Sequence, residues 1–394
     1  MMKYLLVIYV ALLTGWQSYA ATLSSSDIQA KAYILIEADS ERVLTQYRAT
    51  ERLSPASITK LMTAYVVYKS IASGLLSLDD STVISAEARA MTEGSRMFIE
   101  QGSRVTIAEL LHGLVVQSGN DAAVALAEAV AGSEQAFVEL MNQAAAALAM
   151  TDSHFKNVTG LTQEGHYMSA HNIAILARAI IKQFPEHYRL YKEKSFTWNG
   201  IKQANRNTLL KTDPTVDGLK TGYTEAAGYC LTVSAKRHDM RLISVVLGTK
   251  SKAARVRASE KMLDYGFSNY RLQTFYRADQ VITRINVKNG KQDNIAVAST
   301  DDVILPVTAQ EATQINARLV VDASLAAPLA GGQQVGHFEI RLADQVLLTV
   351  PAKILSSVEE IGLLQRFWRY LMAVISDFFV TLWQFIKQTV SAWF

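Results

Sequence analysis

The chain has 394 residues, with 39 basic and 36 acidic side chains and a formal net charge of +3 at pH 7. This mild charge, without a basic cluster interleaved with aromatic residues, argues against nucleic acid as a partner. The single cysteine, Cys230, excludes an intramolecular disulfide, so apolar packing alone must stabilise the fold.

Residues 1–20 have the pattern of a secretory signal peptide. Lys3 precedes an apolar run from Tyr4 to Leu13, and the small residues of Ser18-Tyr19-Ala20 form a cleavage pattern. We therefore expect an exported protein whose mature chain begins at Ala21. The alternative is an uncleaved anchor, although the apolar run is short for a bilayer span.

Residues 21–272 are predicted to form an α+β domain, because strand patterns flank a helical middle. Ala32 to Glu37 and Arg42 to Tyr47 have the pattern of a β-hairpin. The sequence from Thr59 to about Val130 has a mainly helical pattern. An inserted helical region is therefore expected between the first strands and those that follow.

Further strands are predicted in the second half of this domain. Asn199-Gly200 is a signal for a short hairpin. Gly228 to Ala235 and Leu242 to Gly248 are strand patterns joined by the polar turn Lys236 to Asp239. We expect the first and last strands to meet in one antiparallel sheet flanked by helices.

The sequence pattern changes beyond about Arg271. Residues 273–357 contain short β-type runs separated by turn residues, such as Val335 to Leu342 and Val346 to Val350. This pattern predicts a small all-β domain. No catalytic constellation is visible in it.

Residues 358–394 are predicted to form an amphipathic helix that anchors the protein to a membrane surface. Its polar residues fall within an arc of about 140° on a helical projection, opposite a face rich in aromatic residues and leucine. One alternative is a transmembrane span from Tyr370 to Ile386, which would bury Asp377 at a cost of about 2.5 to 3.5 kcal/mol. The other is a helix packed against the protein.

The stretch Pro55-Ala56-Ser57-Ile58-Thr59-Lys60 contains a candidate nucleophile. Pro55 favours the start of a helix, and residues three apart share a helix face, so the Lys60 amine can reach the Ser57 hydroxyl. Lysine can act as a base only when burial or a nearby cation lowers its pKa. Ser-x-x-Lys also recurs at Ser153-His154-Phe155-Lys156, and the alternative for either copy is a capping serine with a solvated lysine.

Two further motifs, Ser118-Gly119-Asn120 and Lys220-Thr221-Gly222, occur once each. Ser118 lies between two helical patterns, so we expect it on a tight turn with its hydroxyl directed outward; an ordinary helix cap is the alternative. We expect Lys220-Thr221-Gly222 to open a strand, where Gly222 lets a ligand approach the sheet edge. A loop lysine with a turn glycine is the alternative there.

Together and in this order, the three motifs resemble those of the penicillin-recognising serine enzymes. More narrowly, Pro55 to Lys60, Ser118 to Ala123 and Asp217 to Thr224 are similar to the D-alanyl-D-alanine carboxypeptidases among the low-molecular-weight penicillin-binding proteins. The resemblance covers roughly residues 30–390. It implies a β-lactamase/transpeptidase-like catalytic domain, no cofactor, and peptidoglycan stem peptides and β-lactam antibiotics as ligands.

The resemblance also implies catalytic roles. Ser57 would attack the carbonyl between two terminal D-alanines, and Lys60 would take its proton. Ser118 would relay that proton to the leaving amine, and Asn120 would bind the substrate amide. Lys220 would keep Lys60 uncharged.

Substrate binding is implied for a second group of residues. Lys220 and Thr221 would attract the substrate carboxylate beside Gly222, and the backbone N–H groups of Ser57 and Tyr223 would form the oxyanion hole. Arg255 and Arg206 match arginines beside the site in this family. Arg255 is the better candidate for the carboxylate, because a guanidinium pairs with it in a bidentate manner; a surface arginine on a helix is the alternative.

Two departures from the family pattern matter. Gly119 stands where the general motif has aspartate, and no motif places a glutamate as the base for deacylation; Glu164 lies in a polar loop and is not expected to be catalytic. The seven histidines lack the spacing of a metal site, which argues against a zinc carboxypeptidase, and His166 and His171 are expected to be structural.

The sequence therefore predicts a serine D-Ala-D-Ala carboxypeptidase that acts at the periplasmic face of the cytoplasmic membrane, as a peripheral protein. A β-lactamase would share the chemistry and differ by fast deacylation of penicillin. A penicillin-binding scaffold protein without catalytic activity is the alternative of another class.

Overall fold

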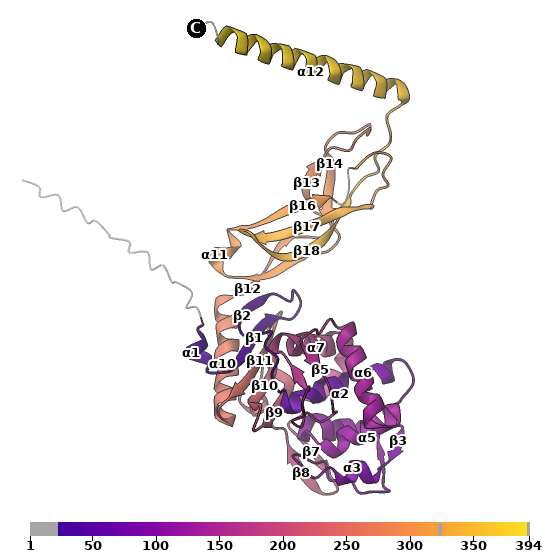
Figure 1. The fold of residues 1–394 in the computed structure, drawn as a ribbon, viewed down its shortest axis with the longest axis vertical. Helices are drawn as coiled ribbons and strands as arrows, with labels where there is room; N and C mark the ends of the chain where they lie inside the picture. Colours follow the sequence, from indigo (N-terminus) through magenta and orange to yellow (C-terminus); the bar gives the residue numbers. More distant parts are fainter. Residues whose placement is uncertain (1–22, 322–324, 392–394) are drawn as a thin grey trace, which may run out of the picture.

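The computed structural model describes residues 23–321 and 325–391 of the chain. Figure 1 shows an α+β domain, followed by an elongated β domain and a long helix at the opposite end of the molecule. The predicted signal peptide lies outside the described residues.

The first domain contains a five-stranded antiparallel sheet with the order β2-β1-β11-β10-β9. Its strands are β1 (Ala32–Glu37), β2 (Val43–Tyr47), β9 (Val216–Thr224), β10 (Gly228–Arg237) and β11 (Met240–Thr249). The register of β1 on β11 runs from Ala32 opposite Leu247 to Glu37 opposite Leu242. The predicted meeting of the first and last strands is therefore confirmed.

The sheet separates two apolar cores, because successive strand side chains point to opposite faces. Ile34 and Ile36 of β1 join the core on the side of the inserted helices, whereas Tyr33 and Leu35 join the core on the other side. Two helices, α1 (Ser25–Ile28) and α10 (Lys252–Asn269), cover that other face (Figure 1).

The inserted region is mainly helical, as predicted. It comprises the short helical turn η1 (Ala56–Thr59), α2 (Lys60–Ala72), α3 (Ala86–Ala90), α4 (Ile107–His112), the π-turn η2 (Gly113–Gln117), α5 (Asn120–Ala131), α6 (Glu134–Ala147), α7 (Ala170–Gln183), α8 (Pro185–Tyr188), η3 (Arg189–Lys192) and α9 (Leu209–Thr212). Among these, α7 packs on the central strands, and η1 packs on β9.

Three two-stranded sheets accompany the helices. They are β3 (Ser81–Val83) with β4 (Arg104–Thr106), β5 (Ser153–His154) with β6 (Tyr167–Met168), and β7 (Ser195–Trp198) with β8 (Ile201–Ala204). The last pair confirms the hairpin predicted at Asn199-Gly200. The first two pairs were not predicted, because strands of two or three residues are too short to show a periodic pattern.

The β domain contains two sheets. β12 (Arg271–Tyr276) pairs with β15 (Val303–Val307), and a five-stranded sheet has the order β13-β14-β18-β17-β16. The other elements are β13 (Val281–Ile285), β14 (Ile295–Ser299), α11 (Ala309–Ala312), β16 (Ile315–Val321), β17 (Gln334–Leu342) and β18 (Gln345–Ile354). Buried side chains of both sheets, including Leu305 and Phe338, form its core.

The structure corrects both predicted boundaries of this domain. Arg271 is already paired with Val307, so the domain begins before residue 273. Val358 is only 1% exposed and its N–H donates to the Leu329 carbonyl, so the domain continues beyond residue 357. Val358 and Glu360 each form an isolated β-bridge and not a strand. Isolated bridges produce no periodic pattern in the sequence, so this end of the domain could not be predicted.

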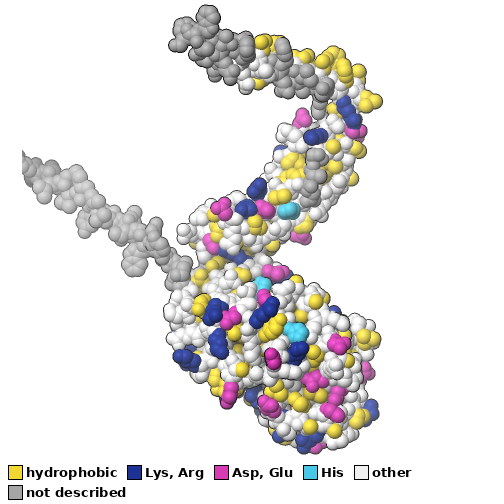
Figure 2. Space-filling model, viewed as in Figure 1, with side chains coloured by type: hydrophobic (Ala, Val, Ile, Leu, Met, Phe, Trp, Pro, Cys, Tyr) yellow, Lys and Arg dark blue, Asp and Glu magenta, His cyan; other side chains and the backbone are white. Residues whose placement is uncertain are grey.

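Helix α12 (Leu363–Ser391) forms as predicted. Many of its large apolar side chains are exposed, with Trp383 at 68% and Met372 at 61%, and Figure 2 shows hydrophobic side chains along it. The alternative of a helix packed against the protein is therefore wrong. No helix in the described part of the chain has the combined length and apolarity needed to cross a membrane.

Candidate active site

Ser57 lies in the short turn η1, immediately before helix α2. Lys60 is the first residue of α2, and its Nζ lies 3.2 Å from the Ser57 Oγ. Ala56 adopts a left-handed backbone conformation, with φ at 49°, directly before the serine. The predicted proximity of the Ser57 hydroxyl and the Lys60 amine is therefore observed.

The Lys60 amine is buried and surrounded by oxygen atoms. Only 1% of the residue is exposed, and its Nζ donates to Asn120 Oδ1 and to the Thr159 carbonyl, both at 2.6 Å. A neutral amine has two N–H groups and one lone pair, and both of these oxygens only accept. The lone pair is therefore left for the Ser57 hydroxyl.

Burial lowers the pKa of the Lys60 amine to about 7. The positive charge of Arg206 lowers the pKa further, and the Asp121 carboxylate opposes the change. Near neutral pH, a large fraction of molecules then holds the uncharged amine that can take a proton from Ser57. We expected the charge of Lys220 to lower the pKa of Lys60. The structure instead shows that Arg206 is the cation that lowers this pKa, with a smaller effect than burial.

Ser118 follows the π-turn η2 in a left-handed conformation, with φ at 68°. It is 2% exposed, and within the described residues its hydroxyl has no hydrogen-bond partner. A buried hydroxyl without a partner costs free energy unless a ligand or water satisfies it. The predicted position between two helices is correct, and the alternative of a helix cap is wrong, because the hydroxyl caps nothing.

Gly119 leaves no room for the aspartate of the general motif. A Cβ there would lie 2.8 Å from Asp121 Oδ1 and 3.1 Å from the Met97 nitrogen. The Asp121 carboxylate accepts hydrogen bonds from the backbone N–H groups of Met97 and Phe98, both at 2.8 Å. Asp121 therefore holds the segment beside Ser118 against helix α5.

Both ends of the Asn120 amide are occupied within the chain. Its Oδ1 accepts from Lys60, and its Nδ2 donates to the Glu93 carbonyl at 2.7 Å. The expectation was a direct contact between Asn120 and the substrate amide. In the structure, the Asn120 side chain instead contacts the Lys60 amine and holds it in place.

Lys220, Thr221 and Gly222 lie in β9, the edge strand of the sheet. The expectation that this motif opens a strand is wrong, because β9 already begins at Val216 and pairs with β10 from there. The residues before Lys220 include Asp217 and Gly218, which disfavour strands in a sequence pattern. Pairing with β10 overrides that local preference.

Lys220 is buried within β9 and is only 3% exposed. Burial lowers the pKa of its amine well below the ordinary value, and the positive charges of Lys60, Arg206 and Arg255 add to this effect. Gly222 lies so close to the serine that a Cβ there would be 2.9 Å from the Pro55 carbonyl. The edge strand can approach η1 only because this residue is glycine.

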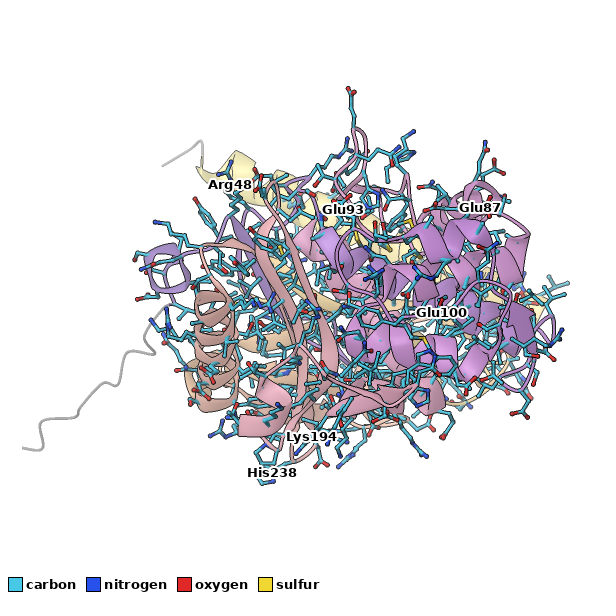
Figure 3. All side chains as sticks on the ribbon, turned by 90° about the horizontal axis from the view of Figure 1, so that it is seen from below. Arg48, Glu87, Glu93, Glu100, Lys194 and His238 are labelled. Atoms are coloured by element: carbon cyan, nitrogen blue, oxygen red, sulfur yellow. The ribbon has the colours of Figure 1, made fainter. Side chains whose placement is uncertain are left out.

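A cavity of about 380 Å³ joins these segments. Eight residues predicted from the sequence line it: Ser57, Ser118, Asn120, Arg206, Thr221, Gly222, Tyr223 and Arg255. Its lining also includes Lys252, so three cations and no carboxylate face this space. The six residues labelled in Figure 3, by contrast, are all exposed at the surface of the catalytic domain.

Arg255 belongs to the wall of this cavity and not to the protein surface. It is 7% exposed, and its guanidinium donates to the carbonyls of Gly222 at 3.0 Å and Cys230 at 3.3 Å. Burial lowers the pKa of Arg255, and the same holds for Arg206. The alternative of a surface arginine is therefore wrong, and both predicted arginines lie beside the site.

The loop that contains Thr159 and Gly160 was not predicted as part of the site. A Cβ on Gly160, whose φ is 82°, would overlap the Ala56 carbonyl oxygen. The Thr159 contribution is a backbone carbonyl, which has no residue-type signal. Glu164 of the same loop is exposed and does not line the cavity, as expected.

Comparisons with known proteins agree with this geometry. A profile of the D-alanyl-D-alanine carboxypeptidase family matches residues 19–251, more than half of the chain. The chain belongs to this family. The C-terminal domain of penicillin-binding protein 5 matches residues 270–360. The family and the serine-type enzyme class predicted from the motifs are thereby confirmed.

Individual members of the D-alanyl-D-alanine carboxypeptidase family are similar over almost the whole chain. DacC of Escherichia coli is 36% identical over 365 residues, which cover 91% of each protein. Penicillin-binding protein 5 of Haemophilus influenzae superposes with a TM-score of 0.78 at 35% identity, over 86% of this chain and all of that one. The likeness confirms the predicted fold class, including the β domain.

A relative has been solved with an antibiotic. Penicillin-binding protein D2 of Listeria monocytogenes, in its ampicillin-bound form, is 27% identical with a TM-score of 0.57 and covers 63% of this chain. The match covers 99% of the Listeria chain.

Proposed function

We propose that this protein removes the terminal D-alanine from peptidoglycan stem pentapeptides through an acyl-enzyme on Ser57. The observation that carries the proposal is the Ser57 hydroxyl 3.2 Å from a buried lysine amine whose N–H groups are directed to two other oxygens. In that arrangement, the lone pair of the amine has one remaining partner, the serine proton.

Acylation then follows from the positions of three side chains. Lys60 takes the proton from Ser57 Oγ as that oxygen attacks the carbonyl of the penultimate D-alanine. Backbone N–H groups of Ser57 and Tyr223 stabilise the oxyanion, each by about 3 to 4 kcal/mol. The peptide C–N bond breaks, and the proton passes from Lys60 through Ser118 to the leaving nitrogen, so that D-alanine departs with a neutral amine and its carboxylate still ionised.

The electrostatics of the cavity support a substrate with a free carboxylate. Arg206, Lys252 and Arg255 are in its lining, which contains no acidic residue, and the buried Lys220 directly precedes Thr221, which also lines it. We assign the terminal carboxylate to Arg255 and Thr221, with Arg206 nearby. A β-lactam carries its carboxylate beside a reactive carbonyl as well, and the ampicillin-bound Listeria relative supports such inhibitors as ligands.

The same proposal includes location and domain organisation. Residues 1–20 direct export, residues 21–270 form the catalytic domain, and residues 271–361 form the β domain. The exposed aromatic and aliphatic side chains of α12, which include Phe367, Trp368 and Trp383, hold the protein on the periplasmic surface of the cytoplasmic membrane.

Mass spectrometry after treatment with penicillin tests the proposal. We expect a long-lived adduct on Ser57, and release of D-alanine from a pentapeptide that is lost in Ser57→Ala. Rapid turnover of penicillin would favour a β-lactamase. A pentapeptide that stays intact beside the wild-type protein would favour a scaffold without catalytic activity.

A further inference from the structure

The loop of residues 155–166 forms one wall of the site, and it is closed at its base. β5 and β6 pair there, with Ser153 opposite Met168 and His154 opposite Tyr167. The far end of the loop lines the cavity with Thr159, Gly160 and Leu161. The loop therefore carries the Thr159 carbonyl that receives a hydrogen bond from the catalytic amine.

This loop is attached to the segment that carries the catalytic pair at three positions. Thr63 Oγ1 donates to the Val158 carbonyl at 2.8 Å, and Lys60 Nζ donates to the Thr159 carbonyl at 2.6 Å. The third contact joins Thr59 Oγ1 and His166 Nε2 at 2.8 Å. Of the three, only this last one comes from a side chain of the loop.

His166 also connects the two limbs of the loop to each other. The backbone N–H of Lys156 donates to His166 Nδ1 at 3.2 Å, and Phe155 packs edge-on against the imidazole ring with centroids 5.8 Å apart. The ring of His166, in the second limb, is thus linked to Lys156 in the first limb and to Thr59, the residue before Lys60.

These contacts determine the protonation state of the ring. Because Nδ1 accepts from a backbone N–H, the proton of the neutral imidazole lies on Nε2, which donates to the Thr59 hydroxyl. His166 is 6% exposed, and burial lowers its pKa to about 4, with a smaller contribution from His154. The ring is therefore a neutral, fixed connector throughout the pH range in which Lys60 titrates.

We infer that His166 is a positioning residue for Lys60: it holds the Thr159 carbonyl where that carbonyl accepts from the amine, and so directs the amine lone pair at Ser57. Without the ring, the loop keeps the Thr63 contact and the hydrogen bonds of Asn157 across its tip, but it loses the link to Thr59 and the connection to Lys156. The carbonyl can then withdraw, and the amine can rotate away from the serine. The inference rests on the proposed acylation of Ser57.

A set of four variants tests this role by the acylation of Ser57 with a fluorescent penicillin. His166→Ala removes both hydrogen bonds, whereas His166→Gln keeps an N–H near the position of Nε2. Thr59→Val removes the hydroxyl and keeps the shape. His154→Ala is the matched control, because that ring belongs to the same loop region but bonds to the Gly165 carbonyl and not to η1 or α2.

We expect His166→Ala to lower the first-order acylation rate constant at least tenfold, since a displacement of about 1 Å costs about 100-fold in such sites. The dissociation constant of the initial enzyme–penicillin complex should stay within about twofold of the wild-type value. The rates are expressed per active site that penicillin can titrate, so unfolded protein does not affect the comparison. His166→Gln should recover most of the rate, and Thr59→Val combined with His166→Ala should lose no more than His166→Ala alone.

Three results would overturn the inference: a loss in His154→Ala as large as in His166→Ala, a His166→Gln variant no faster than His166→Ala, or an unchanged rate in His166→Ala. Nitrogen-15 NMR of the ring adds a measurement that needs no activity, and a proton on Nδ1 at pH 7 would also overturn it. A wild-type protein with no adduct on Ser57 would instead contradict the proposed function.

Discussion

The pH dependence of acylation follows directly from the environment of Lys60. Burial and the charge of Arg206 lower the pKa of this amine from 10.5 to about 7. That change corresponds to about 5 kcal/mol against the ammonium form. The uncharged amine should make up about a tenth of the molecules at pH 6 and about nine tenths at pH 8.

The second-order rate constant for acylation by penicillin should therefore rise about tenfold from pH 6 to pH 8 and level off above. Arg206→Gln removes a positive charge, which raises the pKa of Lys60 and should move the midpoint upward by about one pH unit. This variant also binds a carboxylate less well, which lowers the plateau without moving the midpoint.

Stopped-flow measurements with a fluorescent penicillin between pH 5 and pH 9 provide the assay. Arg189→Gln is the control, because this arginine pairs with Glu186 at the surface and its side chain is 76% exposed. A rate that is flat across the range, or a midpoint that is the same in Arg206→Gln and wild type, would refute a titrating Lys60 as the base.

Three further predictions concern the framework of the site. Gly160→Ala places a Cβ against the Ala56 carbonyl at a position with a left-handed backbone conformation, so we expect a drop in thermal midpoint of several degrees and a loss of acylation. A thermal midpoint equal to that of the wild type in calorimetry would contradict the close contact between Gly160 and Ala56. Truncation after Gly362 keeps the β domain whole and should release an active enzyme from lipid vesicles in a flotation assay, whereas an inactive product would show that α12 belongs to the fold. Arg42 of the catalytic domain contacts the β domain, where it donates to the Pro306 carbonyl and forms an ion pair with Glu311 at 2.6 Å. Arg42→Ala should therefore speed proteolysis between the two domains and leave pentapeptide turnover unchanged. A rate of proteolysis equal to that of the wild type would show that other contacts hold the domains together.

The pairing of Ser57 with Lys60 could be predicted because it is local, and a spacing of three residues within a helical turn determines it. The gathering of Ser118 and Lys220 around this pair required the combination of motifs, since no local pattern brings distant segments together. The partners of Asn120 could not be predicted, because both its bonds depend on tertiary packing.

Contributions from backbone groups and from strands paired over long distances could not be predicted from the sequence either. The Thr159 carbonyl could be supplied by any residue type, so it leaves no trace in the sequence. No strand was predicted at β12 or β15, whose pairing joins two segments that are distant in the sequence. The charge that acts on Lys60 was assigned to Lys220 because the motif names a lysine, whereas Arg206 reaches the amine from a loop with no motif of its own.

Gly160 and Gly222 bring two stretches of main chain against the backbone of Pro55 and Ala56, directly before the nucleophile, and a side chain at either position would meet that backbone. Mutation can therefore do little at these two positions to shield the serine from an antibiotic while sparing the natural reaction. Substitutions that change access to the cavity are better tolerated among its exposed lining residues, such as Tyr223, which is 51% exposed, and Lys252. An inhibitor that contacts the backbone at Gly160 and Gly222 would therefore be difficult to evade by substitution at these two positions.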